Sequence, residues 1–134
     1  MLSEDARKQA SIDEKDDSPA ARMARRWPQK VLVGALVGLP VNDDGDRTLG
    51  LVERVVRAPD GGIKLIVDYN RTFGWFGWFT RPVAVPIEVV AIYGKQIASL
   101  DMQPDAYAKA PTWMRSQEVD LPKDEVIRIA LTKR

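Results

Sequence analysis

Apolar and polar residues alternate with a period of two along several short stretches of the chain, and turn residues separate these stretches. The clearest stretch is residues 63–69, in which every second residue from Ile63 to Tyr69 is apolar or aromatic, and Lys64 and Asp68 lie between them. Such alternation predicts strands with one buried face. The same pattern predicts strands at residues 31–41 (bent at a glycine), 49–58, 63–69, 81–86, 87–93 and 96–100.

Turn residues support these boundaries. Asn42–Asp46 is a turn by composition, and Pro59–Gly62 suits a hairpin because proline presets φ and glycine accepts a positive φ. Gly94 and Lys95 indicate another tight hairpin. The apolar phase changes between Val52 and Val55, which predicts a β-bulge.

The part of the chain after residue 80 is less regular. Prolines bound residues 81–86, and since proline cannot donate to a ladder, this strand is expected at a sheet edge. Pro104–Ala110 is a predicted helical turn, and residues 115–122 a polar linker. Residues 124–132 fit a strand or a helix face, and the strand is favoured because isoleucine and valine are β-formers.

The N-terminal segment has a different composition. Residues 1–20 carry six acidic and three basic side chains and few large apolar groups, so they are expected to be disordered, or at most a frayed helix. A basic cluster follows, and it can attract acids of the tail or of a partner, although a solubilising leader is the simpler interpretation. Its members are Arg22, Arg25, Arg26 and Lys30. The predicted organisation is a disordered charged tail (1–29), one β domain (30–114), and a polar linker with a C-terminal strand (115–134).

Composition argues against catalysis. The 134 residues include no cysteine and no histidine, which removes thiolate sites, the usual general base and the commonest transition-metal ligand. The formal charge of +1 gives no overall attraction to nucleic acid, so no nucleic-acid partner is expected. We therefore expect a protein that is not an enzyme, with no catalytic residue, no cofactor and no metal site.

Two acidic patterns suggest other chemistry. Asn42–Asp46 lacks the alternating ligands and the distal glutamate of a calcium loop, so a solvated turn is favoured. Glu53, Asp68 and Glu88 suggest paired catalytic acids, but cross-strand pairing with basic residues, namely Arg54 or Lys64, is the preferred role.

Targeting signals are weak. No apolar run reaches the roughly 18 residues that a membrane helix needs. Arg25 and Arg26 precede an apolar run, as in a twin-arginine export signal, but Pro28 interrupts the motif and no small-residue cleavage site follows. The chain as given is expected to be cytoplasmic, or periplasmic if a signal peptide was trimmed or the start site miscalled.

Phe73–Phe79, the aromatic segment, holds five of the ten aromatic residues of the chain. It has three interpretations: a plug for the open end of a barrel, a protein-binding hot spot, or an anchor in a membrane interface. For the two binding roles, a basic residue beside the segment, Arg81, is expected to take part. The residues expected to bind a partner are Phe73, Trp75, Phe76, Trp78, Phe79 and Arg81.

The order of these motifs resembles the PRC-barrel family, which includes the photosynthetic reaction-centre H subunit and a ribosome-maturation factor. The matching segments are Val37–Val41, Leu49–Glu53, Pro59–Gly62, Val83–Pro86 with Ile87 and Glu88, and Asp101–Pro111. The resemblance covers about residues 31–114.

The resemblance implies an all-β fold: a small, strongly bent barrel of about six strands, with a short C-terminal helical turn and no intrinsic cofactor. Barrels of this family act as docking modules. The chain lacks the H subunit's membrane helix and the ribosome factor's second barrel, so neither specific function transfers. A stand-alone bacterial member is implied, and we expect a non-enzymatic scaffold that docks a protein partner or a second copy through the aromatic segment. The alternative is a peripheral membrane protein that uses the same segment.

Overall fold

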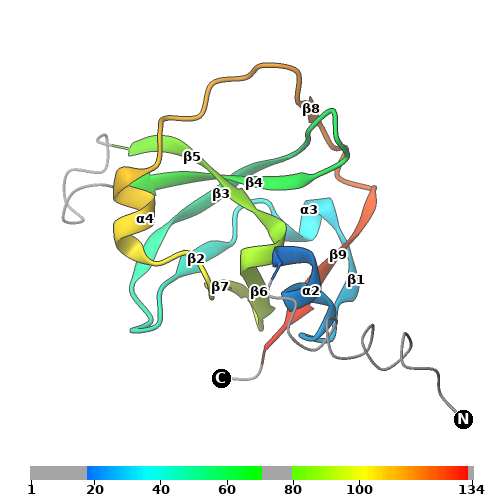
Figure 1. The fold of residues 1–134 in the computed structure, drawn as a ribbon, viewed down its shortest axis with the longest axis horizontal. Helices are drawn as coiled ribbons and strands as arrows, with labels where there is room; N and C mark the ends of the chain where they lie inside the picture. Colours follow the sequence, from blue (N-terminus) through cyan, green and yellow to red (C-terminus); the bar gives the residue numbers. More distant parts are fainter. Residues whose placement is uncertain (1–17, 71–79, 133–134) are drawn as a thin grey trace, which may run out of the picture.

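The computed structural model describes residues 18–70 and 80–132, which form nine strands and four helical segments (Figure 1). Within those two ranges no helix is long and apolar enough to cross a membrane. The helical segments are α2 (Pro19–Ala24), α3 (Val33–Leu36), the 3₁₀ turn η1 (Ile87–Val89) and α4 (Pro104–Lys109). The strands are β1 (Gln29–Leu32), β2 (Pro40–Asn42), β3 (Thr48–Arg57), β4 (Ile63–Asn70), β5 (Thr80–Pro86), β6 (Val90–Tyr93), β7 (Gln96–Ser99), β8 (Val119–Asp120) and β9 (Val126–Leu131).

The strands form one mixed sheet in the order β1-β9-β6-β7-β2-β3-β4-β5, with β8 paired to β3. The β2–β7 and β6–β9 pairs are parallel, and the others are antiparallel. Strand β3 pairs with β4 along one edge and with β2 and β8 along the other. The mainly β class is confirmed. The prediction of a closed barrel of about six strands is wrong, because nine strands are described and their order ends at β1 and β5.

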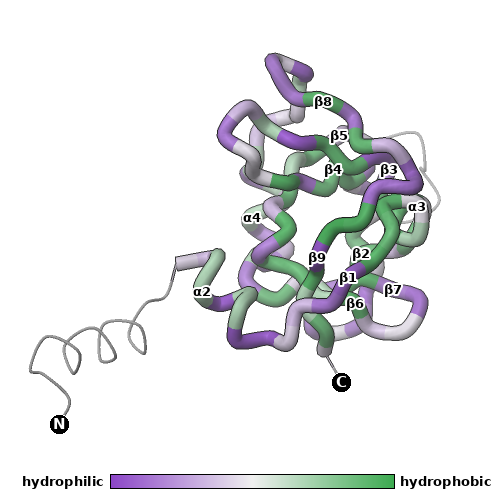
Figure 2. The backbone as a smooth tube through the Cα atoms, turned by 90° about the vertical axis from the view of Figure 1, so that its right-hand side faces the viewer, coloured by the Kyte–Doolittle hydropathy of each residue, from purple (hydrophilic) through white to green (hydrophobic). Residues whose placement is uncertain are grey.

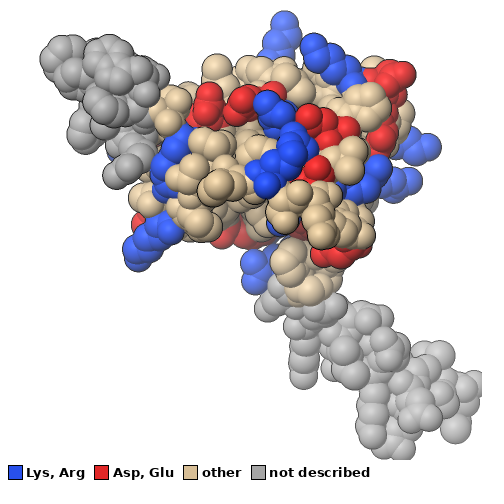
Figure 3. All heavy atoms as spheres, turned by 90° about the horizontal axis from the view of Figure 1, so that it is seen from above, with Lys and Arg blue, Asp and Glu red and all other residues tan. Residues whose placement is uncertain are grey.

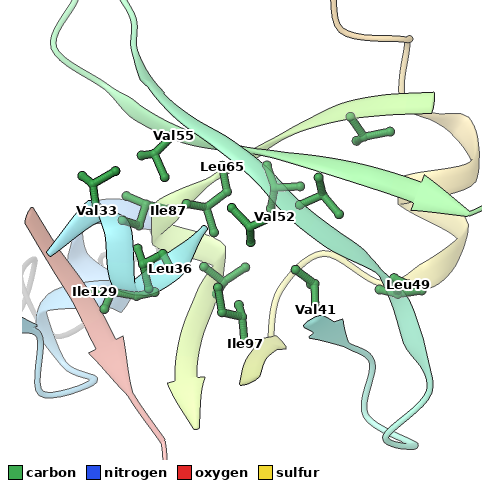
Figure 4. Close-up of a cluster of buried hydrophobic side chains, with 14 of the residues drawn as sticks. Val33, Leu36, Val41, Leu49, Val52, Val55, Leu65, Ile87, Ile97 and Ile129 are labelled. Carbon is green, nitrogen blue, oxygen red and sulfur yellow. The ribbon is translucent and has the colours of Figure 1, made fainter. Parts of the chain in front are cut away.

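The sheet curls around a single hydrophobic core (Figure 4). Side chains from β3 and β4, including Val55 and Leu65, face Leu36 of α3 and Ile129 of β9, and all four are at most 1% exposed. Complete burial of such a side chain contributes about 2 kcal/mol. In Figure 2 the hydrophobic stretches follow inner strands such as β6 and β9. Side chains from both ends of the strand order, β1 and β5, thus contact the same core, although no hydrogen bonds pair these two strands.

The prediction of one bent strand over residues 31–41 is wrong, because α3 interrupts it between β1 and β2. Val33 and Leu36 are both buried, and a spacing of three places both on one side of a helical turn, whereas in a strand they would face opposite sides. The amides of Val33 and Gly34 donate to the carbonyls of Glu125 and Lys123 at 2.9 Å each. These acceptors precede β9, so the pairing of β1 with β9 ends at Leu32.

Other predicted elements are confirmed. The β3–β4 register shifts between Val52 and Arg54, which is the predicted bulge. Gly61 and Gly94 have φ of 89° and 58° in the β3–β4 and β6–β7 turns. The helical turn appears as α4 and the C-terminal strand as β9, and β5 lies at an end of the strand order.

The N-terminal boundary differs from the prediction. Residues 1–17 lie outside the described residues, so the disordered tail is tested only from Ser18 onward. There the chain forms α2, which has Pro19 at its first position and the Ser18 hydroxyl accepting from the Ala21 amide at 3.2 Å. Met23 packs against the core. The helix is therefore part of the folded unit.

Candidate functional site

The aromatic segment departs from the end of an edge hairpin. Asn70 of β4 and Thr80 of β5 are the last paired residues, so residues 71–79 connect two ends that lie side by side. Five of the predicted partner-binding residues lie outside the described residues: Phe73, Trp75, Phe76, Trp78 and Phe79. The structure describes the part of the fold that carries this segment. We call it the platform: the paired ends of β4 and β5 at Asn70 and Thr80, with Tyr69, Arg81 and the helix α4.

Arg81, the sixth predicted binding residue, fastens the platform to α4. Its guanidinium donates to the carbonyl oxygens of Ala110, Tyr107 and Ala108 at 2.6, 2.8 and 2.9 Å. It also lies over the Tyr69 ring, 5.5 Å from the centroid. Carbonyls at a helix C-terminus lack intrahelical donors, so a cation with several donors satisfies them. The contacts described for Arg81 therefore lie within the chain, and its contact with a partner stays a prediction.

The tyrosines beneath Arg81 complete the platform. The Tyr69 and Tyr107 rings lie 5.9 Å apart at an interplanar angle of 32°. Tyr107 is fully buried, and its hydroxyl lies 2.9 Å from the Ser99 hydroxyl, which donates to the Met102 carbonyl at 2.5 Å. Burial raises the pKa of Tyr107 to about 12, although the Ser99 hydrogen bond partly opposes this rise. These contacts tie α4 to β4 and β7.

The raised pKa of Tyr107 predicts a loss of stability in alkali. The unfolded tyrosine ionises near pH 10 and the folded one near 12, so its contribution is complete below about pH 10. The free energy of unfolding should then fall by about 1.4 kcal/mol per pH unit up to about pH 12. Urea titrations of wild type and Tyr107→Phe over this range test the effect. The variant should lack this part of the decline, and equal slopes in the two proteins would contradict the assignment.

The free edge of β5 is closed to further strands. The amide of Trp113 donates to the carbonyl of Pro82 at 2.7 Å, so the even-numbered residues of β5 turn their backbone groups outward. Two of these residues, Pro82 and Pro86, have no amide hydrogen to offer. Prolines on an edge strand prevent pairing with another chain. Docking by strand addition is therefore not available at this edge.

A strap, residues 111–122, crosses from β5 to the far edge of β3 (Figure 1). It is bonded at one end through Trp113 and at the other by the Leu121 amide, which donates to the Val55 carbonyl at 2.9 Å. Because β4 lies between these strands, the strap must cross its outer face, and Ile66 on that face is fully buried. The predicted polar linker is thus packed on the sheet and contains β8.

Charged side chains hold the strap. Arg115 donates to Asp120 at 2.7 Å, and Arg54 lies 3.3 Å from the same carboxylate. The hydrogen bond from Arg115, with smaller help from Arg54, lowers the pKa of Asp120. These groups are roughly half exposed, so each pair contributes little to stability. Figure 3 shows basic and acidic side chains interspersed on this face, which fits pairing better than a single charged docking patch.

Two of the acids that the sequence suggests as a pair, Glu53 and Asp68, lie close enough for their charges to interact. Glu53 pairs with its neighbour Arg54 at 3.5 Å, while burial and the charge of Glu53 raise the pKa of Asp68. Asp43 is buried in its turn, and its carboxylate accepts from the amides of Gly45 and Arg47 at 2.9 Å each. Among residues 18–70 and 80–132, no three acidic, histidine or cysteine side chains gather as metal ligands.

Exposed apolar side chains flank the platform. Met114, next to Trp113 on the strap, is 81% exposed, and Leu51 of β3 is 51% exposed. Leu51, Asp68 and Pro82 form one row across β3, β4 and β5. An exposed aromatic residue, Trp27, lies elsewhere, a few residues after α2. The sequence does not single out Trp27, because neither its exposure nor its backbone conformation can be read from composition.

Comparison with known proteins does not assign the chain. It matches no protein-family model, and it matches no curated protein.

Proposed function

We propose that the protein is a non-enzymatic binding module that docks a protein partner, or a second copy of itself, through the aromatic segment. The supporting observation is the anchoring of that segment's base. Asn70 and Thr80 are paired, and the next residue, Arg81, donates to three carbonyls at the end of α4. A rigid base reduces the entropy lost on binding, and tryptophan is enriched where binding energy concentrates.

We also propose that the chain is related to the PRC-barrel family. The order of the bulged β3, the hairpin at Gly61, the proline-bounded β5 and the helix α4 supports this relationship. The nine-stranded sheet is a departure from the implied barrel. Because barrels of that family act as docking modules, the resemblance supports the same class of function as the platform does.

Affinity capture tests the docking role. Immobilised wild type should retain a partner, or a second copy, and Trp75→Ala with Trp78→Ala should reduce retention about tenfold or more, since tryptophans dominate binding hot spots. The matched control is Trp27→Ala, which removes an exposed tryptophan that is not part of the segment. Control and wild type should retain equal amounts.

The same variants separate a protein partner from a membrane surface. We expect no co-sedimentation with anionic or neutral vesicles, because Arg81, the predicted cation for lipid headgroups, is engaged by α4. Vesicle binding that Trp75→Ala with Trp78→Ala abolishes would support the interfacial role instead. Unchanged protein retention by a folded double variant would contradict the docking role.

A further inference from the structure

Trp27 is a described residue whose exposure and backbone conformation are not explained by packing in the core. Its side chain is 79% exposed, and its φ of 55° lies in the left-handed region. A bulky residue there is strained, at a cost of about 1 kcal/mol or more. A surface tryptophan in a strained conformation gains no burial that offsets this cost. Such outliers are typical of binding sites.

Neighbouring contacts fix the Trp27 backbone. The guanidinium of Arg26 donates to both carboxylate oxygens of Asp101, at 2.7 and 2.9 Å. The carbonyl of Arg26 accepts from the Leu131 amide at 3.0 Å. These bonds join the residue before Trp27 to both β9 and the segment after β7. The hydrogen bond from Arg26 lowers the pKa of Asp101, so the ion pair is held near neutral pH.

A cavity of about 730 Å³ opens beside the indole. Its apolar wall comes from Trp27, Leu100 and Leu131, and its polar wall includes Arg25 and Gln29. A pocket of this size suits a short peptide segment or a small molecule. The combination of an aromatic ring with arginine side chains favours an anionic occupant over a neutral one.

The chain has a segment of matching charge next to this cavity. Residues 1–17 hold six acidic and three basic side chains, whereas residues 22–30 hold four basic side chains and no acid. One described acid, Asp101, lies against this basic cluster. From Ser18, α2 covers roughly 9 Å to the cavity, and five extended residues can span about 16 Å. Asp13 and Glu14, five and four residues before Ser18, can therefore reach it, whereas Asp16 and Asp17 lie too close to Ser18.

We propose that the cavity beside Trp27 binds the acidic N-terminal segment, residues 1–17, as an intramolecular occupant. Tethering gives that segment a high effective concentration, so weak contacts between its carboxylates and the basic cluster suffice. The residues that line this cavity do not include Asn70 or Thr80, which carry the aromatic segment, and the inference does not depend on the proposed function. It gives the tail a role other than that of a solubilising leader.

Paramagnetic broadening in the full chain tests this contact. The protein has no cysteine, so Ser11→Cys takes a single nitroxide label. The Trp27 indole N–H signal, assigned by its loss in Trp27→Phe, should broaden. Asp13→Asn with Glu14→Gln should weaken the broadening roughly twofold, since the attraction is electrostatic and screened. The Trp113 indole, which bonds Glu118 on the strap, serves as an internal reference.

The matched control neutralises two exposed acids elsewhere, by Asp105→Asn with Asp124→Asn. It should leave the broadening of the Trp27 signal unchanged. Equal broadening in the labelled parent and in the tail variant would overturn the proposal, because the tether alone would then explain it. An equal effect of the two double variants would overturn it too, since the attraction would not be specific to the tail.

Discussion

Replacing Gly50 by alanine is expected to lower the free energy of unfolding by roughly 3 kcal/mol or more. A Cβ at Gly50 would lie 2.2 Å from the carbonyl oxygen of Asp68 and 2.8 Å from its carbonyl carbon. Both atoms belong to the β4 backbone, which is paired on its other edge with β5 and cannot move aside alone. The clash would therefore push apart β3 and β4 near the end of the hairpin that carries the aromatic segment.

Urea unfolding of Gly50→Ala and of a matched glycine variant measures this effect. Gly45 lies in an exposed turn, and a Cβ there would have its nearest neighbour at 3.5 Å, an ordinary contact. Gly45→Ala should change stability by less than about 1 kcal/mol. If the two variants are equally stable, the close approach of β3 and β4 at Gly50 is not present in solution.

Removing the Arg81 side chain is the second large expected effect. Arg81→Ala should cost about 2 kcal/mol or more, because it leaves three carbonyls at the end of α4 without their donor and removes the contact over Tyr69. Arg81→Lys should recover only part of this loss, since an ammonium lacks the planar fork that reaches several carbonyls. Thermal unfolding of the two variants gives the comparison.

Lys109→Ala is the control for charge at the same helix end. Lys109 is 82% exposed and pairs with Asp105 at only 4.0 Å, so its loss should change stability by about 0.5 kcal/mol or less. If Arg81→Ala is as stable as Lys109→Ala but loses partner binding, Arg81 acts at the interface. The platform would then not depend on it.

Where the predicted strands and turns match the fold, the prediction came from patterns within a few neighbouring residues. Every second residue from Ile63 to Tyr69 is apolar or aromatic, and Gly61 and Gly94 adopt the positive φ that their hairpins require. Residues 31–41 alternate as regularly, yet α3 interrupts them, because Val33 and Leu36 gain burial in a core built from distant strands. Such a choice depends on tertiary packing, which alternation along the chain cannot reveal.

The site was predicted less well than the strands. A cation beside an aromatic segment indicates an interface, but the carbonyls that bind Arg81 come from α4, about thirty residues later in the chain. The strap was expected to be a linker because its residues are polar, and only the fold brings Leu121 to β3. Trp27 is informative through its exposure and its φ, and the sequence reports neither.

The free energy of unfolding of Trp75→Ala with Trp78→Ala is the most direct test of the central proposal, that the aromatic segment serves binding and does not plug the core. A segment displayed for a partner should leave the stability of the isolated protein within about 0.5 kcal/mol of wild type. A plug would place these tryptophans in the core, where their truncation should cost about 3 kcal/mol or more. A loss of that size would contradict the proposed function.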